Sequence, residues 1–230
     1  MSQSQRCKTI SKVMPSRTFY GEREKCYCCF RPVSSCMCKY IRPLKTKTKF
    51  VVLMHTHEFK KIKNGTGHFT YLSLENSQLY VDTSFAGHKA VNALLDDRDN
   101  NCYVLYPGEE SIVLNEKPLV SSAKQNVIFL IDSTWHNAKK LLRDSPNIQA
   151  LPKVSFEHTK NSGFKIKEQP MELCLSTIES THCVLELLNL HGDEKLTPSE
   201  LNGFLEPFRK MVEYQVRCTT LENRSPRFRA

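Results

Sequence analysis

The sequence predicts an α/β protein in which a largely parallel sheet is flanked by helices, with a small cysteine-rich segment on its N-terminal side. From Lys49 onward, short apolar runs alternate with longer amphipathic stretches, which is typical of strands joined by helices. The run from Val127 to Ile131 has five consecutive apolar residues, as expected of a strand buried on both faces. Between Cys26 and Cys38, five cysteines lie within thirteen residues, which is rare for ordinary core positions.

The expected strands are short apolar runs, several of which end at a polar residue or a turn. They are Phe50 to Met54, Leu79 to Asp82, Cys102 to Tyr106, Val127 to Ile131 and Glu172 to Leu175, with a weaker pattern at Lys153 to Phe156. The expected helices have apolar residues at three- and four-residue spacing and are Thr66 to Glu75, His88 to Asp96, Trp135 to Arg143 and Ile178 to Leu190. A last helix begins at the capping box Thr197-Pro198-Ser199-Glu200 and runs to about Arg217.

The composition predicts one principal folded domain. The chain has 230 residues, of which 40% are hydrophobic and 25% charged, close to the average of globular proteins. We divide it into a polar basic arm (1–25), a cysteine segment (26–45), an α/β domain (46–220) and a basic tail (221–230). No apolar stretch approaches the ~18 residues of a membrane span, and no hydrophobic leader is present, so we expect a cytoplasmic protein with no membrane partner. No feature indicates an oligomeric state.

The chain carries an excess of positive charge. Lysine and arginine number 33 against 24 aspartate and glutamate residues, which gives a net charge of +9. Such an excess favours polyanionic partners, of which RNA and DNA fit best. The alternative is that the charge only keeps the protein in solution, so other features must decide between the two.

The cysteine cluster predicts a structural zinc site with the ligands Cys26, Cys29, Cys36 and Cys38. A tetrahedral zinc ion needs four soft donors, and two close pairs joined by a short loop provide them. Cys28 could replace Cys29, and buried thiols without a metal are a further alternative. Because four thiolates leave no position for water, the metal would fold the segment and position basic residues such as Arg31.

The sequence lacks part of the motifs that define two classes of enzyme. The segment His55-Thr56-His57-Glu58 superficially resembles the His-x-Glu of zinc deaminases, but no Pro-Cys-x-x-Cys follows, so a catalytic zinc is a minor alternative there. No glycine-rich dinucleotide fingerprint follows any expected strand, which disfavours an oxidoreductase.

Polar or conformationally special residues follow three expected strands, at the edge where open α/β sheets bind ligands. Asp132 directly follows the buried run, and Ser133-Thr134 can cap the helix that Trp135 opens. Ser176-Thr177 repeats this design, and Tyr106-Pro107-Gly108 forms a rigid turn that brings the backbone close to a ligand. A capped helix with Trp135 in the core is the alternative for the first loop, but its repetition favours a ligand-binding edge.

These segments resemble the DTW-domain family. Asp132-Ser133-Thr134-Trp135 matches its D-x-T-W signature, Leu175-Ser176-Thr177-Ile178-Glu179 its L-S-T-x-E segment and Leu105-Tyr106-Pro107 its L-Y-P turn. The cysteine cluster matches as well, so the resemblance runs in order from about Cys26 to Leu190. The chain departs from the family at Phe164-Lys165-Ile166-Lys167, where the family has an aromatic-Arg-x-Arg stretch. Positive charge is kept there, but bidentate recognition of phosphate or carboxylate is lost.

The resemblance implies a SPOUT-type, knotted α/β fold and the activity of a tRNA-uridine aminocarboxypropyltransferase. Such enzymes transfer the 3-amino-3-carboxypropyl group of S-adenosylmethionine to N3 of a tRNA uridine and release methylthioadenosine. Two alternatives use the same features. One is an RNA methyltransferase that uses S-adenosylmethionine, and the other is a non-catalytic, zinc-dependent RNA-binding protein.

The resemblance also suggests roles for individual residues. The expected donor-binding residues are Leu105, Tyr106, Pro107, Gly108, Ser133, Thr134, Trp135, Leu175, Ser176 and Thr177. Asp132 is the candidate general base, and its carboxylate would alternatively hold the ammonium group of the donor. Arg31, Lys165 and Lys167 are expected to bind the phosphates of tRNA.

Overall fold

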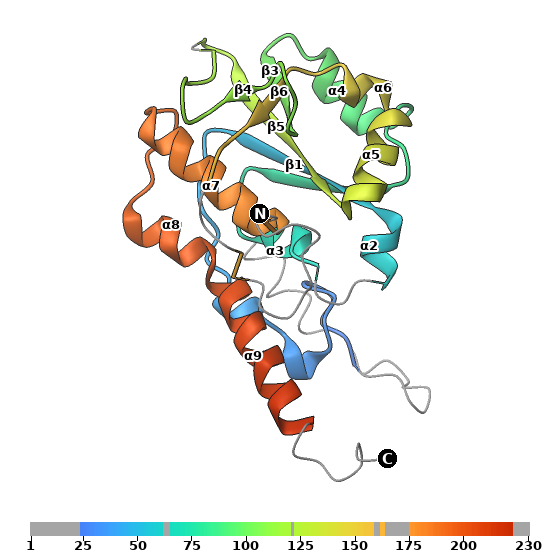
Figure 1. The fold of residues 1–230 in the computed structure, drawn as a ribbon, viewed down its shortest axis with the longest axis vertical. Helices are drawn as coiled ribbons and strands as arrows, with labels where there is room; N and C mark the ends of the chain where they lie inside the picture. The colour runs from blue at the N-terminus through green and yellow to red at the C-terminus, as the bar shows by residue number, and fades with distance from the viewer. Residues whose placement is uncertain (1–23, 62–64, 121, 159–161, 164–174, 223–230) are drawn as a thin grey trace.

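The computed structural model describes residues 24–61, 65–120, 122–158, 162–163 and 175–222. Within these ranges, six parallel strands form one sheet in the order β2-β1-β5-β3-β6-β4 (Figure 1). The strands are β1 (Lys49–His55), β2 (Ser77–Asp82), β3 (Asn100–Leu105), β4 (Ile112–Val113), β5 (Gln125–Asp132) and β6 (Lys153–Ser155). The α/β class and the parallel sheet are thereby confirmed.

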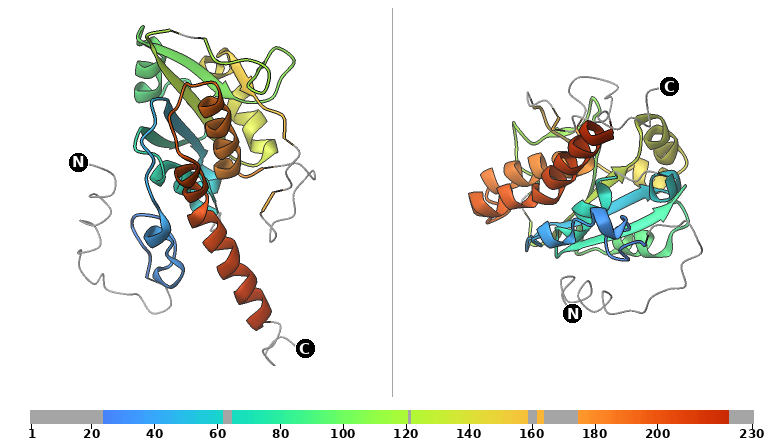
Figure 2. Two further views of the ribbon diagram at one scale, coloured as in Figure 1. Left: turned by 90° about the vertical axis from the view of Figure 1, so that its left-hand side faces the viewer. Right: turned by 90° about the horizontal axis from the view of Figure 1, so that it is seen from below.

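Helices cover both faces of this sheet (Figures 1 and 2). The α-helices are α2 (Thr56–Lys61), α3 (Gly67–Leu72), α4 (Lys89–Asp96), α5 (Trp135–Arg143), α6 (Pro146–Gln149), α7 (Thr177–Leu190), α8 (Pro198–Phe204) and α9 (Glu206–Glu222). Two short 3-10 helices, η1 (Val33–Ser35) and η2 (Cys38–Tyr40), lie in the cysteine segment. The expected helix at 135–143 has the predicted bounds, whereas α2, α6 and the two-residue strand β4 were not predicted.

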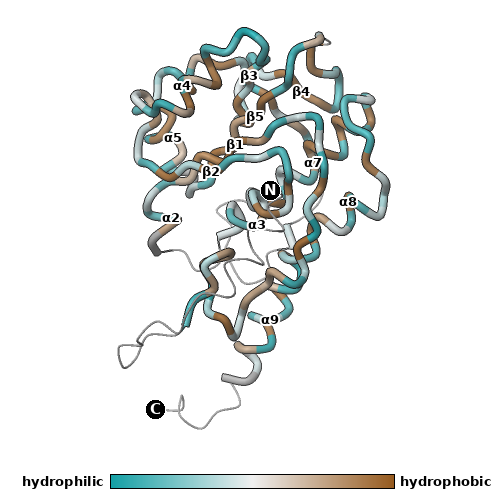
Figure 3. Tube along the Cα trace, turned by 180° about the vertical axis from the view of Figure 1, so that it is seen from behind, coloured by the Kyte–Doolittle hydropathy of each residue, from teal (hydrophilic) through white to brown (hydrophobic). Residues whose placement is uncertain are grey.

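The sheet separates two apolar clusters, because successive side chains of a strand point to opposite faces. Phe50 and Val52 of β1 belong to the cluster that includes residues of α3, α7, α8 and α9. Val51 and Leu53 belong to the other cluster, which α4, α5 and α6 cover. Residues 127–130 of β5 are fully buried between β1 and β3, as their apolar run predicts. The same contrast is visible in Figure 3, where β1 and β5 are largely brown and the outer helices alternate between brown and teal.

The C-terminal region contains two helices where the sequence analysis expected one. The capping box at Thr197 and Glu200 is confirmed, because the Thr197 backbone N–H and hydroxyl both donate to the Glu200 carboxylate. The chain bends at Leu205, between α8 and α9. Pro207 explains the break, since proline lacks an N–H and its ring clashes with the carbonyl four residues earlier. Pro207 is therefore the signal in the sequence for this break.

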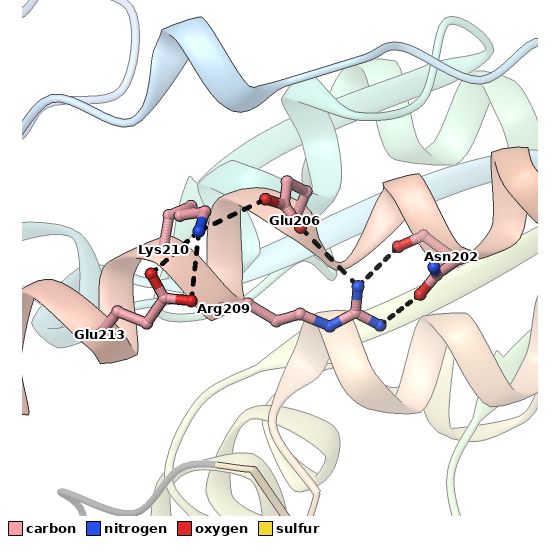
Figure 4. Close-up of polar contacts among 5 residues, drawn as sticks. All are labelled: Asn202, Glu206, Arg209, Lys210 and Glu213. Carbon is pink, nitrogen blue, oxygen red and sulfur yellow. Dashed lines mark hydrogen bonds and ion pairs between the residues drawn. The ribbon is translucent and has the colours of Figure 1, made fainter.

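Polar contacts connect the two helices across this bend (Figure 4). Arg209 donates to the backbone oxygen and the side-chain oxygen of Asn202, at 3.1 and 2.6 Å, and lies 3.8 Å from Glu206. Lys210 lies 2.9 Å from Glu213 and 3.8 Å from Glu206. These pairs lie at the surface and contribute little to stability, but their carboxylates offset the positive charge of α9.

The cysteine segment packs against the first part of α9, below the sheet in the view of Figure 1. Cys29 and Met37 of this segment are buried in the same apolar cluster as α7 and α8. Residues 172–174 of the expected strand Glu172 to Leu175 lie outside the described residues, and so does most of the connection from β6 to α7. The knotted topology therefore stays a prediction. None of the helices in the described ranges is long and apolar enough to cross a membrane.

Candidate active site at the carboxyl edge of the sheet

Asp132 is the last residue of β5 and lies near the middle of the sheet. Its side chain is buried, with the residue only 6% exposed. The hydroxyl of Thr177, the first residue of α7, donates to Asp132 Oδ1 at 2.5 Å. On the neighbouring strand β1, Met54 is the register partner of Asp132. The carboxylate is therefore held in place by two elements that lie far apart in the sequence.

The start of α3 approaches the same carboxylate from another direction. A Cβ atom added to Gly67 would overlap with Asp132 Oδ2 and would lie 2.9 Å from Met54 Cε. Real Cβ atoms do not come this close to their neighbours, so only glycine leaves room for the carboxylate at this position. Gly67 thereby allows the backbone of α3 to form one wall beside Asp132.

Replacing Gly67 with alanine is expected to displace the Asp132 carboxylate. We expect the free energy of unfolding to fall by ~1–3 kcal/mol because of the overpacking. If Asp132 is the catalytic base that the sequence predicts, the turnover rate should also fall at least about tenfold, because the carboxylate is displaced from the reacting atoms. Denaturant unfolding and turnover measure the two effects. The matched control is Gly203→Ala in α8, where an added Cβ meets nothing within 4 Å. Wild-type stability and activity in Gly67→Ala would contradict the close approach.

A pocket of about 280 Å³ opens between the carboxyl ends of β3, β5 and β6 and the first turn of α7. Ile131 and Ser133 line it, whereas Asp132 between them is buried and contacts the lining through Thr177. Its lining is mostly apolar, with a few hydroxyl groups, two aromatic rings and one histidine. The lining residues are Leu105, Tyr106, Pro107, Leu130, Ile131, Ser133, Ala138, Val154, Ser155, Phe156, His158, Leu175, Thr177 and Ser180. The Ser133 hydroxyl is buried and has no hydrogen-bond partner among the residues that the structure describes. A buried hydroxyl of this kind is suited to bind a polar group of a ligand.

The four cysteines of the predicted ligand set are close enough to bind one metal ion. The Sγ atoms of Cys26 and Cys38 are 3.7 Å apart, those of Cys29 and Cys36 are 3.8 Å apart, and all four lie within 4.8 Å of one another. A tetrahedral ion with metal–sulfur bonds of about 2.3 Å separates its sulfur ligands by about 3.8 Å, which matches these distances. Cys28 is disulfide-bonded and does not belong to this group.

The four thiols also perturb one another. Hydrogen bonding with Cys36 raises the pKa of Cys29 to about 11. Hydrogen bonding with Cys29 lowers the pKa of Cys36 to about 2 and raises the pKa of Cys38. The negative charge therefore lies on the Cys36 sulfur, next to thiols that hydrogen-bond to it. A bound cation would stabilise such a charge.

Comparison with known proteins assigns the chain to a family. The sequence profile described as the DTW domain matches residues 23–216, which include the cysteine group, Asp132 and all of the pocket lining. The chain belongs to the DTW domain family.

Relatives in this family carry the name tRNA-uridine aminocarboxypropyltransferase 2. The relative from Drosophila melanogaster is 29% identical over 215 residues, which cover 90% of this chain and 81% of that protein. The relative from Mus musculus is 26% identical over 197 residues, which cover 84% of this chain and 64% of that protein. The chain thus spans less than two thirds of the mouse protein. No solved structure matches the chain.

The DTW motifs meet at the pocket, but not every predicted residue lines it. Of the residues expected to bind the donor, Leu105, Tyr106, Pro107, Ser133, Leu175 and Thr177 are part of the lining. The Thr134 hydroxyl instead accepts a hydrogen bond from the Asn137 backbone and caps α5. Gly108 lies next to the Lys153 side chain. Trp135 opens α5 as predicted, and its side chain lies outside the described part of the chain.

Ser176 has a structural contact in this DTW domain. Its backbone N–H and its hydroxyl donate to the Glu179 carboxylate at 2.9 and 2.6 Å, which forms a capping box at the start of α7. The same carboxylate accepts hydrogen bonds from the Ser162 hydroxyl and the Gly163 backbone, at 2.8 and 2.7 Å. Glu179 therefore connects the segment before the L-S-T motif to the helix that carries Thr177.

The end of β6 contributes lining residues that the sequence analysis missed. They are Val154, Ser155, Phe156 and His158. The expected strand Lys153 to Phe156 indicated them, since the carboxyl ends of parallel strands meet at one edge. The sequence does not reveal that β6 pairs with β3, and this pairing places Val154 next to Leu105.

The predicted phosphate-binding residues have different positions in the DTW domain. Arg31 is buried, at 6% exposure, and its guanidinium lies 5.6 Å from the centre of the Phe69 ring and donates to the Ser35 carbonyl oxygen. This burial lowers the pKa of Arg31. Lys165 and Lys167 lie outside the described residues. Their contact with tRNA stays a prediction, and Arg31 has partners within the protein.

His68, next to Gly67, is expected to make the protein sensitive to acid. Burial lowers the pKa of His68 to about 4, whereas an unfolded histidine has a pKa near 6.5. Between these pH values the unfolded chain binds more protons than the folded chain. The contribution of His68 to the free energy of unfolding is therefore complete above pH 6.5. It decreases as the pH falls toward 4, by at most ~1.4 kcal/mol per pH unit. His68→Phe keeps a ring at this position and should flatten the difference in unfolding free energy between pH 7 and pH 4. Equal pH dependence in both proteins would contradict this.

Proposed function

We propose that this DTW protein is a tRNA-uridine aminocarboxypropyltransferase that transfers the 3-amino-3-carboxypropyl group of S-adenosylmethionine to N3 of a tRNA uridine. The observation that carries the proposal is the position of Asp132, a buried carboxylate at a central strand end. It lies next to a pocket that Ser133 of the D-x-T-W motif and residues of the L-Y-P and L-S-T motifs line. Family membership and the names of the relatives support this activity. The net charge of +9 supports an RNA substrate.

The residues of the pocket fit a nucleoside that carries a polar chain. At about 280 Å³ the pocket is close to the lower limit of small-molecule sites, which is about 300 Å³. The Tyr106 and Phe156 side chains offer aromatic surface for a flat base. Ser133 offers a buried hydroxyl that no described residue satisfies, and Thr177 lies between the pocket and Asp132. When bound, the donor supplies a sulfonium whose carbon–sulfur bond breaks as the bond to N3 forms.

The protein has two tasks in this transfer. It must hold the uridine base outside any stack, with N3 in line with the carbon that it attacks, and it must accept the N3 proton. We assign the second task to Asp132, whose orientation is fixed by the hydrogen bond from Thr177. Methylthioadenosine then leaves as a neutral thioether, and the proton passes from the carboxylate to solvent.

We also propose that Cys26, Cys29, Cys36 and Cys38 bind zinc in a structural role. The spacing of their sulfur atoms suits a tetrahedral ion, and a closed set of four thiolates favours zinc among the metals of the cell. The segment packs against α9 and the main core, so the metal would stabilise a segment on which this packing depends.

The activity is tested by incubating the purified protein with unmodified tRNA and S-adenosylmethionine and by locating added mass on digested fragments. We expect the mass of an aminocarboxypropyl group on a uridine-containing fragment and release of methylthioadenosine. An added methyl group would instead identify an RNA methyltransferase. If no tRNA gains mass while salt-dependent tRNA binding persists, the protein is an RNA-binding module and the proposal is wrong.

A further inference from the structure

An exposed aromatic cluster lies between the cysteine segment and the helices that follow β1. The ring centres of Phe30 and Phe59 are 5.4 Å apart, and His68 lies 5.0 Å from Phe30 and 5.6 Å from Phe59. Phe30 is 49% exposed and Phe59 is 41% exposed, although burying either ring would favour folding. Tyr27, at 58% exposure, lies on the same turn of the cysteine segment. We name the exposed rings of Phe30 and Phe59, together with the partly buried His68 that packs against both, the aromatic platform.

The backbone holds Phe30 in this exposed position. Among the described residues other than glycine, Phe30 alone has a positive φ, at 56°. A left-handed conformation is uncommon for a bulky residue, and where it occurs the surrounding structure must impose it. Here the Phe30 N–H donates to the Cys26 carbonyl at 2.8 Å, and the Cys26 N–H donates to the Arg31 carbonyl at 2.7 Å. The turn that contains the predicted metal ligands Cys26 and Cys29 therefore fixes the direction of an exposed ring.

The platform is connected directly to the candidate active site. His68 follows Gly67, the residue whose backbone lies against the Asp132 carboxylate. Phe59 lies on α2, which begins where β1 ends, and β1 is paired with β5 along its length. Figure 1 shows α2 and α3 at the same edge of the sheet as the end of β5. A polymer whose reacting residue lies at Asp132 would therefore pass close to the platform.

We propose that the aromatic platform stacks unpaired nucleobases of the RNA substrate that flank the reacting uridine. Aromatic side chains next to positive charge are the usual means of holding single-stranded nucleic acid, because every base has a face that can stack. The net charge of +9 and the exposed side chains of Lys25 and Lys39 in the same segment favour a polyanion over an apolar protein partner. This inference rests on the proposed function only in taking RNA as the substrate.

The test measures RNA binding, which does not require transfer. The probes are a labelled eight-nucleotide oligoadenylate, the same strand with abasic sites throughout, and a twelve-base-pair RNA duplex, whose lengths are chosen at roughly the site size of one stacking platform. We expect Phe59→Leu to weaken binding of the oligoadenylate about tenfold, since leucine keeps apolar area but cannot stack. Binding of the abasic strand and of the duplex should stay within about twofold. The slope of affinity against salt concentration should not change, because no phosphate contact is removed.

Two further variants separate stacking from other causes. Phe59→Tyr retains an aromatic face and should bind the oligoadenylate like the wild type. Leu190→Ala removes an apolar side chain that is 75% exposed and lies outside the platform, and it should have no effect. Phe30→Leu should reproduce Phe59→Leu. Because Phe30 lies within the predicted metal-binding turn, the metal content of the Phe30→Leu protein is measured as well. Phe59 lies outside that turn.

Unchanged oligoadenylate binding in Phe59→Leu would overturn the inference, and so would an equal loss for the abasic strand. The exposed rings would then be a docking face for a protein. The outcome is independent of the activity assay. A tenfold loss of oligoadenylate binding in a protein that modifies no tRNA supports the platform and contradicts the proposed function. If the protein modifies tRNA and the leucine variants bind oligoadenylate like the wild type, the proposed function is supported and the platform is contradicted.

Discussion

Replacing Asp132 with asparagine is expected to slow aminocarboxypropyl transfer by a factor of about 10² to 10⁴, the usual contribution of a general base. Asparagine has nearly the same shape and can still accept the hydrogen bond from Thr177, so the fold should be retained. It cannot accept the N3 proton. Single-turnover rates on unmodified tRNA, with the unfolding curve of each variant as a control, measure this effect. Full transfer activity in Asp132→Asn would show that the carboxylate is not the base.

The same variant separates the two roles considered for this carboxylate. If Asp132 acts as a base, S-adenosylmethionine binds the variant as it binds the wild type, and only the rate falls. If Asp132 holds the ammonium group of the donor, the dissociation constant of the donor rises. The binding free energy then weakens by ~1.5–3 kcal/mol, which is the contribution of a hydrogen bond to a charged group. Calorimetry with the donor distinguishes them. Thr177→Val is the matched variant, because it removes the group that orients Asp132 and keeps the charge.

Replacing Cys36 with serine is expected to have the largest effect on stability. The variant should lose its bound metal, and the melting temperature should fall by ~8–16 °C, which corresponds to ~4 kcal/mol in a protein of this size. The physical reason is that three thiolates hold zinc far less tightly than four, and the segment depends on the metal for its fold. The loss should spread to α9 and the main core, because Cys29 and Met37 are buried there.

Elemental analysis and thermal unfolding test this expectation together. The control is Cys218→Ser, which changes a cysteine of α9 outside the group of four and should retain one metal ion per chain. A chelator strong enough to remove zinc should lower the melting temperature of the wild type to that of Cys36→Ser. A wild-type protein that contains no metal after purification in zinc, with the same melting temperature as the variant, would contradict a metal-dependent segment.

Features that depend on neighbouring residues were predicted well. The apolar run at 127–131 lies within β5, and the helix 135–143 begins and ends where its pattern indicates. The capping box at Thr197 forms as expected, because a cap needs only a hydroxyl and a carboxylate three residues apart. A second capping box, at Ser176, was not predicted, although Ser176 and Glu179 have the same spacing. The expected single helix from 198 to about 217 was wrong by one break, at a proline that the sequence contains. Short elements such as β4 and α6 were missed, since a few residues carry too little periodicity to be recognised.

The sequence by itself determined the parallel α/β class, the four metal-binding candidates and the strand ends that carry the DTW motifs, because each depends on contacts within a short stretch of chain. The tertiary structure alone decided which strand ends meet. The order β2-β1-β5-β3-β6-β4 brings Ser133, Thr177 and the end of β6 to one pocket, next to the buried Asp132. It also placed Gly67 against the carboxylate and Phe59 beside Phe30. These contacts follow from the packing free energy of the whole chain, in which distant segments compete for the same apolar surface, and no local pattern encodes them.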